Sequence, residues 1–240
     1  METTNKRDFI NYAHRGAPAY CPENTMLSFY TGIYMGANGI ETDVQRTKDG
    51  VLVLFHDDTL ERVCGVSGSI KDYTYEELKG FPVKKGELSD LIPTLEDFLS
   101  HFSHFPIKFA IELKVGGIEK EVADTIFAHG IENKATVTSF ALNLVKNVKA
   151  YAPTLRTGYL NKSVDEELLN TLKEYGIDEL CPIGTDVTEE KVKYWHSLGF
   201  GVRAWGIYNE ETMKRVYDAG ADGMTVNFPD KLTEYIKAKQ

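Results

Sequence analysis

The sequence has few cysteines and no long apolar run, and each shortage excludes a class of protein. Its 240 residues contain only Cys21, Cys64 and Cys181, an odd number without a CxxC pair, so no disulfide framework is expected. No run reaches the length of a transmembrane helix, so no membrane segment is expected. The first residues, METTNKRDFINYAH, lack the apolar centre of a signal peptide. A cytoplasmic location is therefore preferred, although a secreted form that had lost its leader would look the same.

Basic residues are also in short supply, with 27 Lys and Arg against 36 Asp and Glu and a net charge of −9. Nucleic-acid-binding proteins neutralise phosphates with clustered Lys and Arg, so this balance argues against a nucleic-acid partner. A small anionic substrate remains compatible, because the charge at a site can oppose the net charge. Hydrophobic residues at 42% and charged residues at 26% indicate a globular protein rather than a disordered or membrane one.

Short β-prone runs alternate with helical segments through most of the chain. With the hairpin at residues 39–57 counted as the second strand, eight strands and eight helices predict an α/β fold, a (β/α)8 TIM barrel in one domain over residues 1–240. A doubly wound open sheet would also alternate, but no phosphate-binding glycine fingerprint follows the first strand. The expected strands are 9–14, 39–44, 107–112, 135–138, 156–160, 179–182, 201–205 and 223–226. The expected helices are 25–35, 94–102, 119–128, 142–151, 165–175, 189–197, 210–219 and 231–239.

Residues 58–93 are less regular than the rest. They hold a Gly/Ser loop at 64–69, a short helical segment at 75–79 and a turn-rich stretch at 81–93. We interpret them as a small insertion after the second strand of the barrel, because they have too few apolar residues for a core of their own.

The stretch GIETDVQRTKDGVLVLFHD, residues 39–57, brings two acids and a histidine together. Glu41 and Asp43 are two residues apart on a strand, so their side chains point the same way and can converge on one cation. Asp49-Gly50 between two apolar runs predicts a hairpin, which would return His56 towards the acids. The pattern is the outline of a metal-assisted hydrolytic site.

Other polar residues follow the ends of expected strands, where the chemistry of a barrel gathers. They are His14 and Arg15 after the first strand, Glu112 and Lys114 after the third, Arg203 and Trp205 at the seventh, and Asn227 after the eighth.

Each of these residues also has a structural interpretation. A lone histidine at a strand end is more often a packed, hydrogen-bonded residue, and Trp205 is most simply a core aromatic. Glu41 and Asp43 can belong to a surface salt-bridge network, and Glu112 and Lys114 can pair with each other. Two histidines, three acids and two bases at the ends of three consecutive strands are nevertheless hard to explain as packing.

This set of side chains suits the cleavage of a phosphodiester. Glu41, Asp43 and Glu112 make a hard oxygen cage for calcium or magnesium, which would polarise a phosphoryl oxygen. Arg15 and Lys114 can bind the other phosphate oxygens. His14 and His56 can divide the proton transfers, because the pKa of histidine lies near neutrality.

The sequence resembles the glycerophosphodiester phosphodiesterases over most of its length. YAHRGAPAYCPENTMLSF is similar to the first motif of that family, and GIETDVQRTKDGVLVLFHDDTLERVCGVSG is similar to the second. IPTLEDFL, AIELKVG, VRAWGIYN and DAGADGMTVNFPD follow in the expected order. The first two motifs together are highly specific. The late motifs depart from the family where Trp205-Gly206-Ile207-Tyr208-Asn209 replaces Trp-Thr-Val-Asn and where Val226-Asn227 precedes Phe228, changes that bear on the outer wall of the pocket.

The resemblance implies a role for each matching position. It implies His14 and His56 as the acid/base pair, Glu41, Asp43 and Glu112 as ligands of one divalent cation, Arg15 and Lys114 beside the phosphate, Glu23 as a supporting glutamate and Trp205 at the glycerol end of the pocket. The implied reaction converts a glycerophosphodiester to sn-glycerol 3-phosphate and an alcohol. In that family the neighbouring glycerol hydroxyl is commonly drawn attacking phosphorus, and water then opens a cyclic phosphate.

Two alternatives remain open. The same site could act on a bulkier lipid, such as a lysophospholipid or a sphingomyelin-like lipid, although no Lys-rich amphipathic helix suited to a membrane surface is evident. A barrel that only binds a phosphate-containing ligand is the other, but a binder has no need of a paired proton donor and acceptor. The sequence leaves open the metal, the alcohol, the oligomeric state, and which histidine is the acid.

Overall fold

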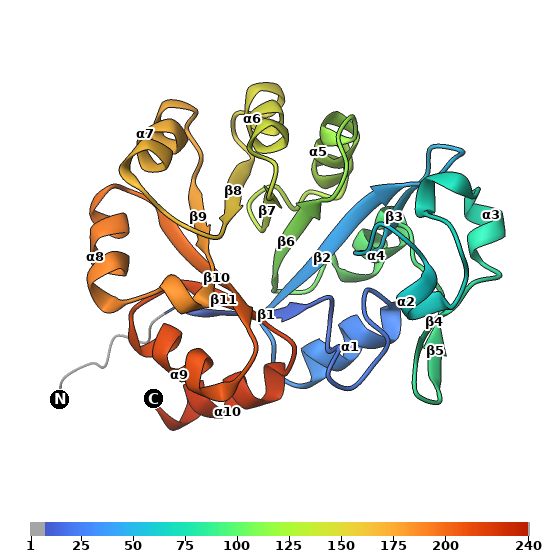
Figure 1. Cartoon of the computed structure of the whole chain (residues 1–240), viewed down its shortest axis with the longest axis horizontal. Coiled ribbons are helices and arrows are strands. Elements are labelled where there is room, and N and C mark those ends of the chain that lie inside the picture. The colour runs from blue at the N-terminus through green and yellow to red at the C-terminus, as the bar shows by residue number, and fades with distance from the viewer. Residues whose placement is uncertain (1–7, 240) are drawn as a thin grey trace.

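Eight parallel strands close into a barrel in the computed structural model, which describes residues 8–239 (Figure 1). Their order around the barrel is β1-β11-β10-β9-β8-β7-β6-β2, and β1 pairs with β2 to close it. This confirms the predicted (β/α)8 barrel. The barrel strands are β1 (Ile10–His14), β2 (Gly39–Arg46), β6 (Lys108–Leu113), β7 (Ala135–Ser139), β8 (Arg156–Asn161), β9 (Glu179–Pro182), β10 (Gly201–Ile207) and β11 (Gly223–Val226).

Each barrel strand is followed along the chain by a helix, and these helices cover the outer face of the barrel (Figure 1). After β2, residues 58–93 come before the helix. Several of these helices are capped at the N-terminus by a side-chain oxygen that accepts a hydrogen bond from a backbone amide of the first turn. Thr25 accepts from the amide of Ser28, and Asp165 accepts from the amide of Leu168. The helices are α1 (Met26–Tyr34), α4 (Leu95–Phe102), α5 (Glu119–Ala128), α6 (Leu142–Tyr151), α7 (Glu166–Glu174), α8 (Glu189–Ser197), α9 (Glu210–Asp218) and α10 (Pro229–Ala238).

The apolar core lies mainly between the strands and these helices. One buried cluster joins β2, β6 and β7 to α4, α5 and α6, and a second joins β9, β10 and β11 to α7, α8 and α9. Because both faces of a parallel barrel are covered, the strands are buried almost throughout, as β2 and β6 show. The rigid ends of these strands are what hold the polar residues described below.

The predicted hairpin is present. Strand β3 (Leu52–Leu54) runs antiparallel to the end of β2, with Val44 opposite Leu54 and Arg46 opposite Leu52. Gly50 has a φ of 92°, which the turn between the two strands requires. The hairpin extends β2 beyond the barrel and brings the chain back, so His56 lies beside the carboxyl end of the barrel.

Residues 58–93 form the expected insertion at one side of the barrel (Figure 1). The expectation that they have no apolar core of their own is wrong. Seven of their buried residues, including Leu60, Ile70 and Leu78, pack together with Val53 and Phe55 from the hairpin side. The elements are α2 (Glu61–Cys64), the 3-10 turn η1 (Ile70–Asp72), α3 (Tyr75–Leu78), β4 (Val83–Lys85) and β5 (Leu88–Asp90).

All three cysteines are buried and unpaired, as the absence of a disulfide framework predicts. Within residues 8–239, no helix combines the length and the apolar character needed to cross a membrane.

Candidate active site

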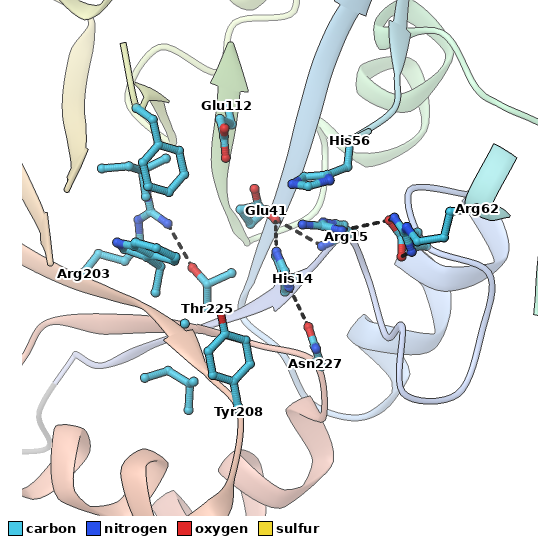
Figure 2. A pocket seen from close by; sticks show the side chains of 16 residues that line it. His14, Arg15, Glu41, His56, Arg62, Glu112, Arg203, Tyr208, Thr225 and Asn227 are labelled. Carbon is cyan, nitrogen blue, oxygen red and sulfur yellow. Dashed lines mark hydrogen bonds and ion pairs between the residues drawn. The ribbon is translucent and has the colours of Figure 1, made fainter. Parts of the chain in front are cut away.

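A cavity of about 430 Å³ opens at the carboxyl ends of the strands (Figure 2). Seven of the nine side chains to which the family resemblance assigns a role line it: His14, Arg15, Glu23, Glu41, His56, Glu112 and Trp205. The other two, Asp43 and Lys114, form ion pairs with the lining residues Arg15 and Glu112. The site is therefore assembled at the end of the barrel where the strand pattern places it.

The three predicted acids form one cluster. Asp43 on β2 is opposite Glu112 on β6, and Glu41 is two residues before Asp43 on the same face. One carboxylate oxygen from each lies within 4.8 Å of the others. All three residues are buried, with 4%, 0% and 7% of the surface of Glu41, Asp43 and Glu112 exposed. Their oxygens form the kind of donor set that calcium and magnesium prefer.

Burial and mutual repulsion make this cluster hold protons in the absence of a cation. Burial and the neighbouring carboxylates raise the pKa of Glu41 well above its usual range. Burial and the charge of Asp43 raise the pKa of Glu112 to about 7. Burial opposes ionisation of Asp43 as well, but the charges of Arg15 and Lys114 lower its pKa. The neighbouring cations therefore do not compensate the negative charge that Glu41 and Glu112 would carry when ionised.

The contacts of Asp43 leave one oxygen available. Its Oδ2 accepts a hydrogen bond of 2.9 Å from Nδ2 of Asn24, whose Oδ1 accepts another from Thr42. Its Oδ1 has no hydrogen-bond partner and lies 3.7 Å from Nζ of Lys114. A buried carboxylate oxygen without a hydrogen bond is the position a cation would fill, so the residues present fit a divalent ion.

Lys114 also forms the ion pair with Glu112 that the sequence allowed, at 2.9 Å. This ion pair and the carboxylate cluster are both present in the structure, and Nζ of Lys114 lies near a second member of the cluster, 3.7 Å from Oδ1 of Asp43.

His14 ends β1 opposite Glu41 of β2. Its Nδ1 donates to Oδ1 of Asn227 at 2.5 Å, and its Nε2 lies 3.8 Å from Oε2 of Glu41 (Figure 2). Burial, together with the charge of Arg15, lowers the pKa of His14 to about 4. The imidazole is therefore neutral at pH 7, with a defined tautomer and its Nε2 lone pair turned towards the cavity.

His56 has the same arrangement from the opposite side. Its Nδ1 donates to Oδ1 of Asp57 at 2.7 Å. The backbone on both sides of His56 is held by Gln45, whose Nε2 donates to the carbonyl oxygens of Phe55 and Asp57. Two imidazoles thus approach one cavity, each with its Nδ1 fixed by an oxygen.

Arg15 lies beside His14 in a strained backbone conformation, with a φ of 50°. Its amide donates to the Glu41 backbone and side chain. The guanidinium contacts Glu23 through Nη1 at 2.8 Å and lies 3.3 Å from Asp43 through Nε. Glu23 thereby supports Arg15, and it also accepts two hydrogen bonds from Arg62 of α2.

The far wall of the cavity is aromatic. The Trp205 ring meets Phe140 edge to face, with centroids 4.8 Å apart, and its Nε1 donates to the carbonyl oxygen of Asn161. Trp205 is half-buried and lines the cavity, so it is a pocket residue and not a core aromatic. The buried Arg203 also lines this cavity, where it is paired with Glu179 at 3.0 Å and donates to Thr225 (Figure 2).

A second cavity of about 590 Å³ adjoins the first. Both are lined by His56, Phe140 and Trp205, and the second adds a largely apolar wall with Tyr159 and Leu168 and one cation, Lys162. Among the residues that the structure describes, no carboxylate lines this second cavity.

Several site residues were not predicted as such from the sequence. Asn227 was noted only as a polar residue after the last strand, and neither Asn24 nor Arg62 was singled out. Asn24 and Asn227 act through Asp43 and His14, which lie 19 and 213 residues away. Arg62 acts through Glu23, 39 residues away, as well as through the nearby Asp57.

Comparison with known proteins agrees with this geometry. Residues 14–231 match the model of the glycerophosphoryl diester phosphodiesterase family. Glycerophosphodiester phosphodiesterases from Bacillus altitudinis and Caldanaerobacter subterraneus are 35% and 32% identical, over 93% and 94% of this chain and 96% of each relative. A phosphodiesterase of Oleispira antarctica, solved with its product sn-glycerol-3-phosphate, superposes with a TM-score of 0.83 at 25% identity and covers 94% of this chain and 96% of that one. The chain is thus a phosphoric diester hydrolase that belongs to the glycerophosphoryl diester phosphodiesterase family.

Proposed function

We propose that this protein hydrolyses glycerophosphodiesters to sn-glycerol 3-phosphate and an alcohol, using one divalent cation, calcium or magnesium, and two histidines. The observation that carries the proposal is the placement of His14 and His56 around a cavity that also holds Arg15 and the carboxylate cluster. The product found in the Oleispira antarctica relative belongs to the same reaction.

Glu41, Asp43 and Glu112 would hold the cation. When bound, the ion would supply Lewis-acid polarisation of a phosphoryl oxygen and the positive charge that the cluster lacks. The chain's own cations bind the rest of the phosphate: Arg15, held in place by Glu23, presents its guanidinium, and Lys114 adds a second charge behind Glu112.

The two imidazoles act as the base and the acid of the reaction. One accepts the proton of the attacking glycerol hydroxyl through Nε2, and the other donates a proton to the departing alcohol oxygen. In the second stage the roles reverse, so that water opens the cyclic phosphate. Asn227 and Asp57 keep both Nε2 atoms turned to the cavity throughout, because each accepts the Nδ1 hydrogen.

The test is an assay of sn-glycerol 3-phosphate released from a panel of glycerophosphodiesters, with and without excess chelator. Release that stops with chelator and returns with calcium or magnesium supports the proposal. Undiminished turnover in excess chelator would remove the metal from it, and no release from any diester would overturn it.

A lysophospholipid or a sphingomyelin-like lipid is the second candidate substrate, and the adjoining cavity favours it. Its wall of Phe140, Tyr159, Leu160 and Leu168 could receive an apolar group beyond Trp205. The same panel, extended to lysophospholipids, separates the two, since a lipid-specific enzyme would prefer the acylated substrate to its deacylated form.

A further inference from the structure

One arginine of the insertion joins two carboxylates at the edge of the catalytic cavity. The Nη1 and Nη2 atoms of Arg62 donate to both oxygens of Glu23, at 2.9 and 2.6 Å. Its Nε and Nη2 donate to both oxygens of Asp57, at 2.5 and 2.9 Å. Figure 2 shows Arg62 at the side of the cavity, beyond Arg15. Two-point pairing of a guanidinium with each of two carboxylates fixes distance and orientation together.

Each of these carboxylates in turn holds a residue of the proposed reaction. Glu23 accepts from Nη1 of Arg15 at 2.8 Å, and Asp57 accepts from Nδ1 of His56 at 2.7 Å. An unbroken series of contacts therefore runs from His56 through Asp57, Arg62 and Glu23 to Arg15.

The same groups could suggest a second cation site, because ligand atoms of Glu23, His56 and Asp57 lie within 4.8 Å of one another. The guanidinium of Arg62 already supplies the positive charge there. All three of its nitrogen atoms donate to the two carboxylates, so it has little capacity left for a substrate phosphate. Its side chain is 51% exposed, yet its guanidinium is paired with Glu23 and Asp57 of the same chain.

The insertion places Arg62 at this position. Arg62 lies on α2, and the next two residues, Val63 and Cys64, are buried in the apolar cluster that also contains Phe55. Phe55 immediately precedes His56. The insertion is thus packed against the segment that carries one catalytic histidine.

We propose that Arg62 is a positioning residue for the reaction, which holds Asp57 against His56 and Glu23 against Arg15. The inference rests on the proposed function, because it gives Arg62 its effect through an acid/base histidine and a phosphate-binding arginine. It also gives the insertion a part in catalysis that its position beside the barrel does not reveal.

The test compares Arg62→Ala and Arg62→Lys with wild type. We expect kcat to fall about 10- to 100-fold in Arg62→Ala, as for other outer partners of catalytic groups, with a smaller loss in Arg62→Lys. Because the side chain is half exposed, added guanidinium ion at sub-denaturing concentration should restore part of the lost rate. Divalent-cation affinity should stay unchanged, since Arg62 has no contact with the carboxylate cluster.

Arg46→Ala is the matched control. Arg46 forms an ion pair of 2.7 Å with Glu121 on the outside of the barrel, so its loss should leave kcat unchanged. Combining Arg62→Ala with Asp57→Asn should cost less than the sum of the two single losses, because both act on His56.

The tautomer of His56 gives a readout that does not depend on activity. Nitrogen-15 NMR should show hydrogen on Nδ1 in wild type and a mixture of tautomers in Arg62→Ala. Wild-type kcat in a folded Arg62→Ala variant, or a lost rate that guanidinium does not restore with the His56 tautomer unchanged, would overturn the proposal. A wild-type protein without diesterase activity would instead contradict the proposed function, and the His56 tautomer would still test the positioning contact.

Discussion

Nζ of Lys114 lies 2.9 Å from Oε1 of Glu112, so a side-chain cation already contacts the cluster proposed to bind metal. That one charge does not neutralise three buried carboxylates. Burial and neighbouring charge still raise the pKa of Glu112 to about 7, and burial with the charges of Asp43 and Glu112 raises that of Glu41 well above its ordinary value. Protons must therefore occupy part of the site that a divalent cation would take.

We expect calcium or magnesium binding at neutral pH to release protons. A carboxyl must ionise to coordinate a metal, so affinity should fall as the pH is lowered through about 7, where Glu112 becomes protonated. Titration calorimetry in buffers with different ionisation enthalpies measures the number of protons released.

Asp43→Asn should abolish this binding, whereas Glu96→Gln, which alters an exposed carboxylate on α4, should leave it intact. Binding that releases no proton across the neutral range would contradict the assignment of these carboxylates as ligands.

Replacing either of the proposed catalytic histidines, His14 and His56, should remove most of the activity. We expect His14→Ala and His56→Ala each to lower kcat on the order of a hundredfold or more, because each removes a proton donor or acceptor. Steady-state assays with saturating cation measure the loss, and circular dichroism checks the fold. His101→Ala, an exposed histidine of α4, is the matched control. Near-normal rates in either variant would exclude that histidine from proton transfer.

His14 should also make stability depend on pH. Burial and the charge of Arg15 lower its pKa from 6.5 to about 4, so between these values the unfolded chain binds a proton that the folded chain does not. Stability contributed in this way is present above pH 6.5 and is lost as the pH falls towards 4.

Urea unfolding at a series of pH values, in chelator, measures this dependence. Between pH 6.5 and 4, the unfolding free energy should change more steeply with pH in wild type than in His14→Gln, by a slope equivalent to up to one bound proton. Equal slopes would mean that His14 titrates alike in the folded and unfolded chains.

The sequence predicted the barrel and the carboxylate cluster, and the register of the barrel strands explains why. The side chains of Glu41 and Asp43 share a face because strand side chains alternate, and parallel pairing then places Glu112 opposite Asp43. The Asp49-Gly50 turn likewise returned His56 to the site. The alternation and the turn are short-range rules that act within one strand or one hairpin, and the regular parallel pairing of barrel strands extends them to Glu112.

The residues that escaped prediction depend on long-range packing. Arg62 meets Glu23 across 39 residues, and Asn227 meets His14 across 213. No local pattern encodes such a distance. The apolar cluster of residues 58–93 was missed for a similar reason, because Val53 and Phe55 complete it from the hairpin.

The buried pair of Arg203 and Glu179 should matter for stability. Both side chains are at least nine-tenths buried, and Nε of Arg203 donates to Glu179 at 3.0 Å. Glu179→Leu would leave the guanidinium buried without its partner, at a cost of about 3–5 kcal/mol in unfolding free energy.

Chemical denaturation measures this cost. The double variant Glu179→Leu/Arg203→Met, which removes both charges, should recover much of the loss. A single variant as stable as wild type would show that the pair contributes little to the barrel.

Trp205 should act on substrate binding more than on the chemical step. Its ring lines both cavities and meets Phe140 edge to face. Trp205→Ala should raise KM for glycerol-containing diesters roughly tenfold, since a lost aromatic contact is worth about 1 kcal/mol or slightly more. Trp205→Phe should keep most of the affinity. Steady-state kinetics separates KM from kcat, and an unchanged KM in Trp205→Ala would place the ring outside the substrate's contact surface.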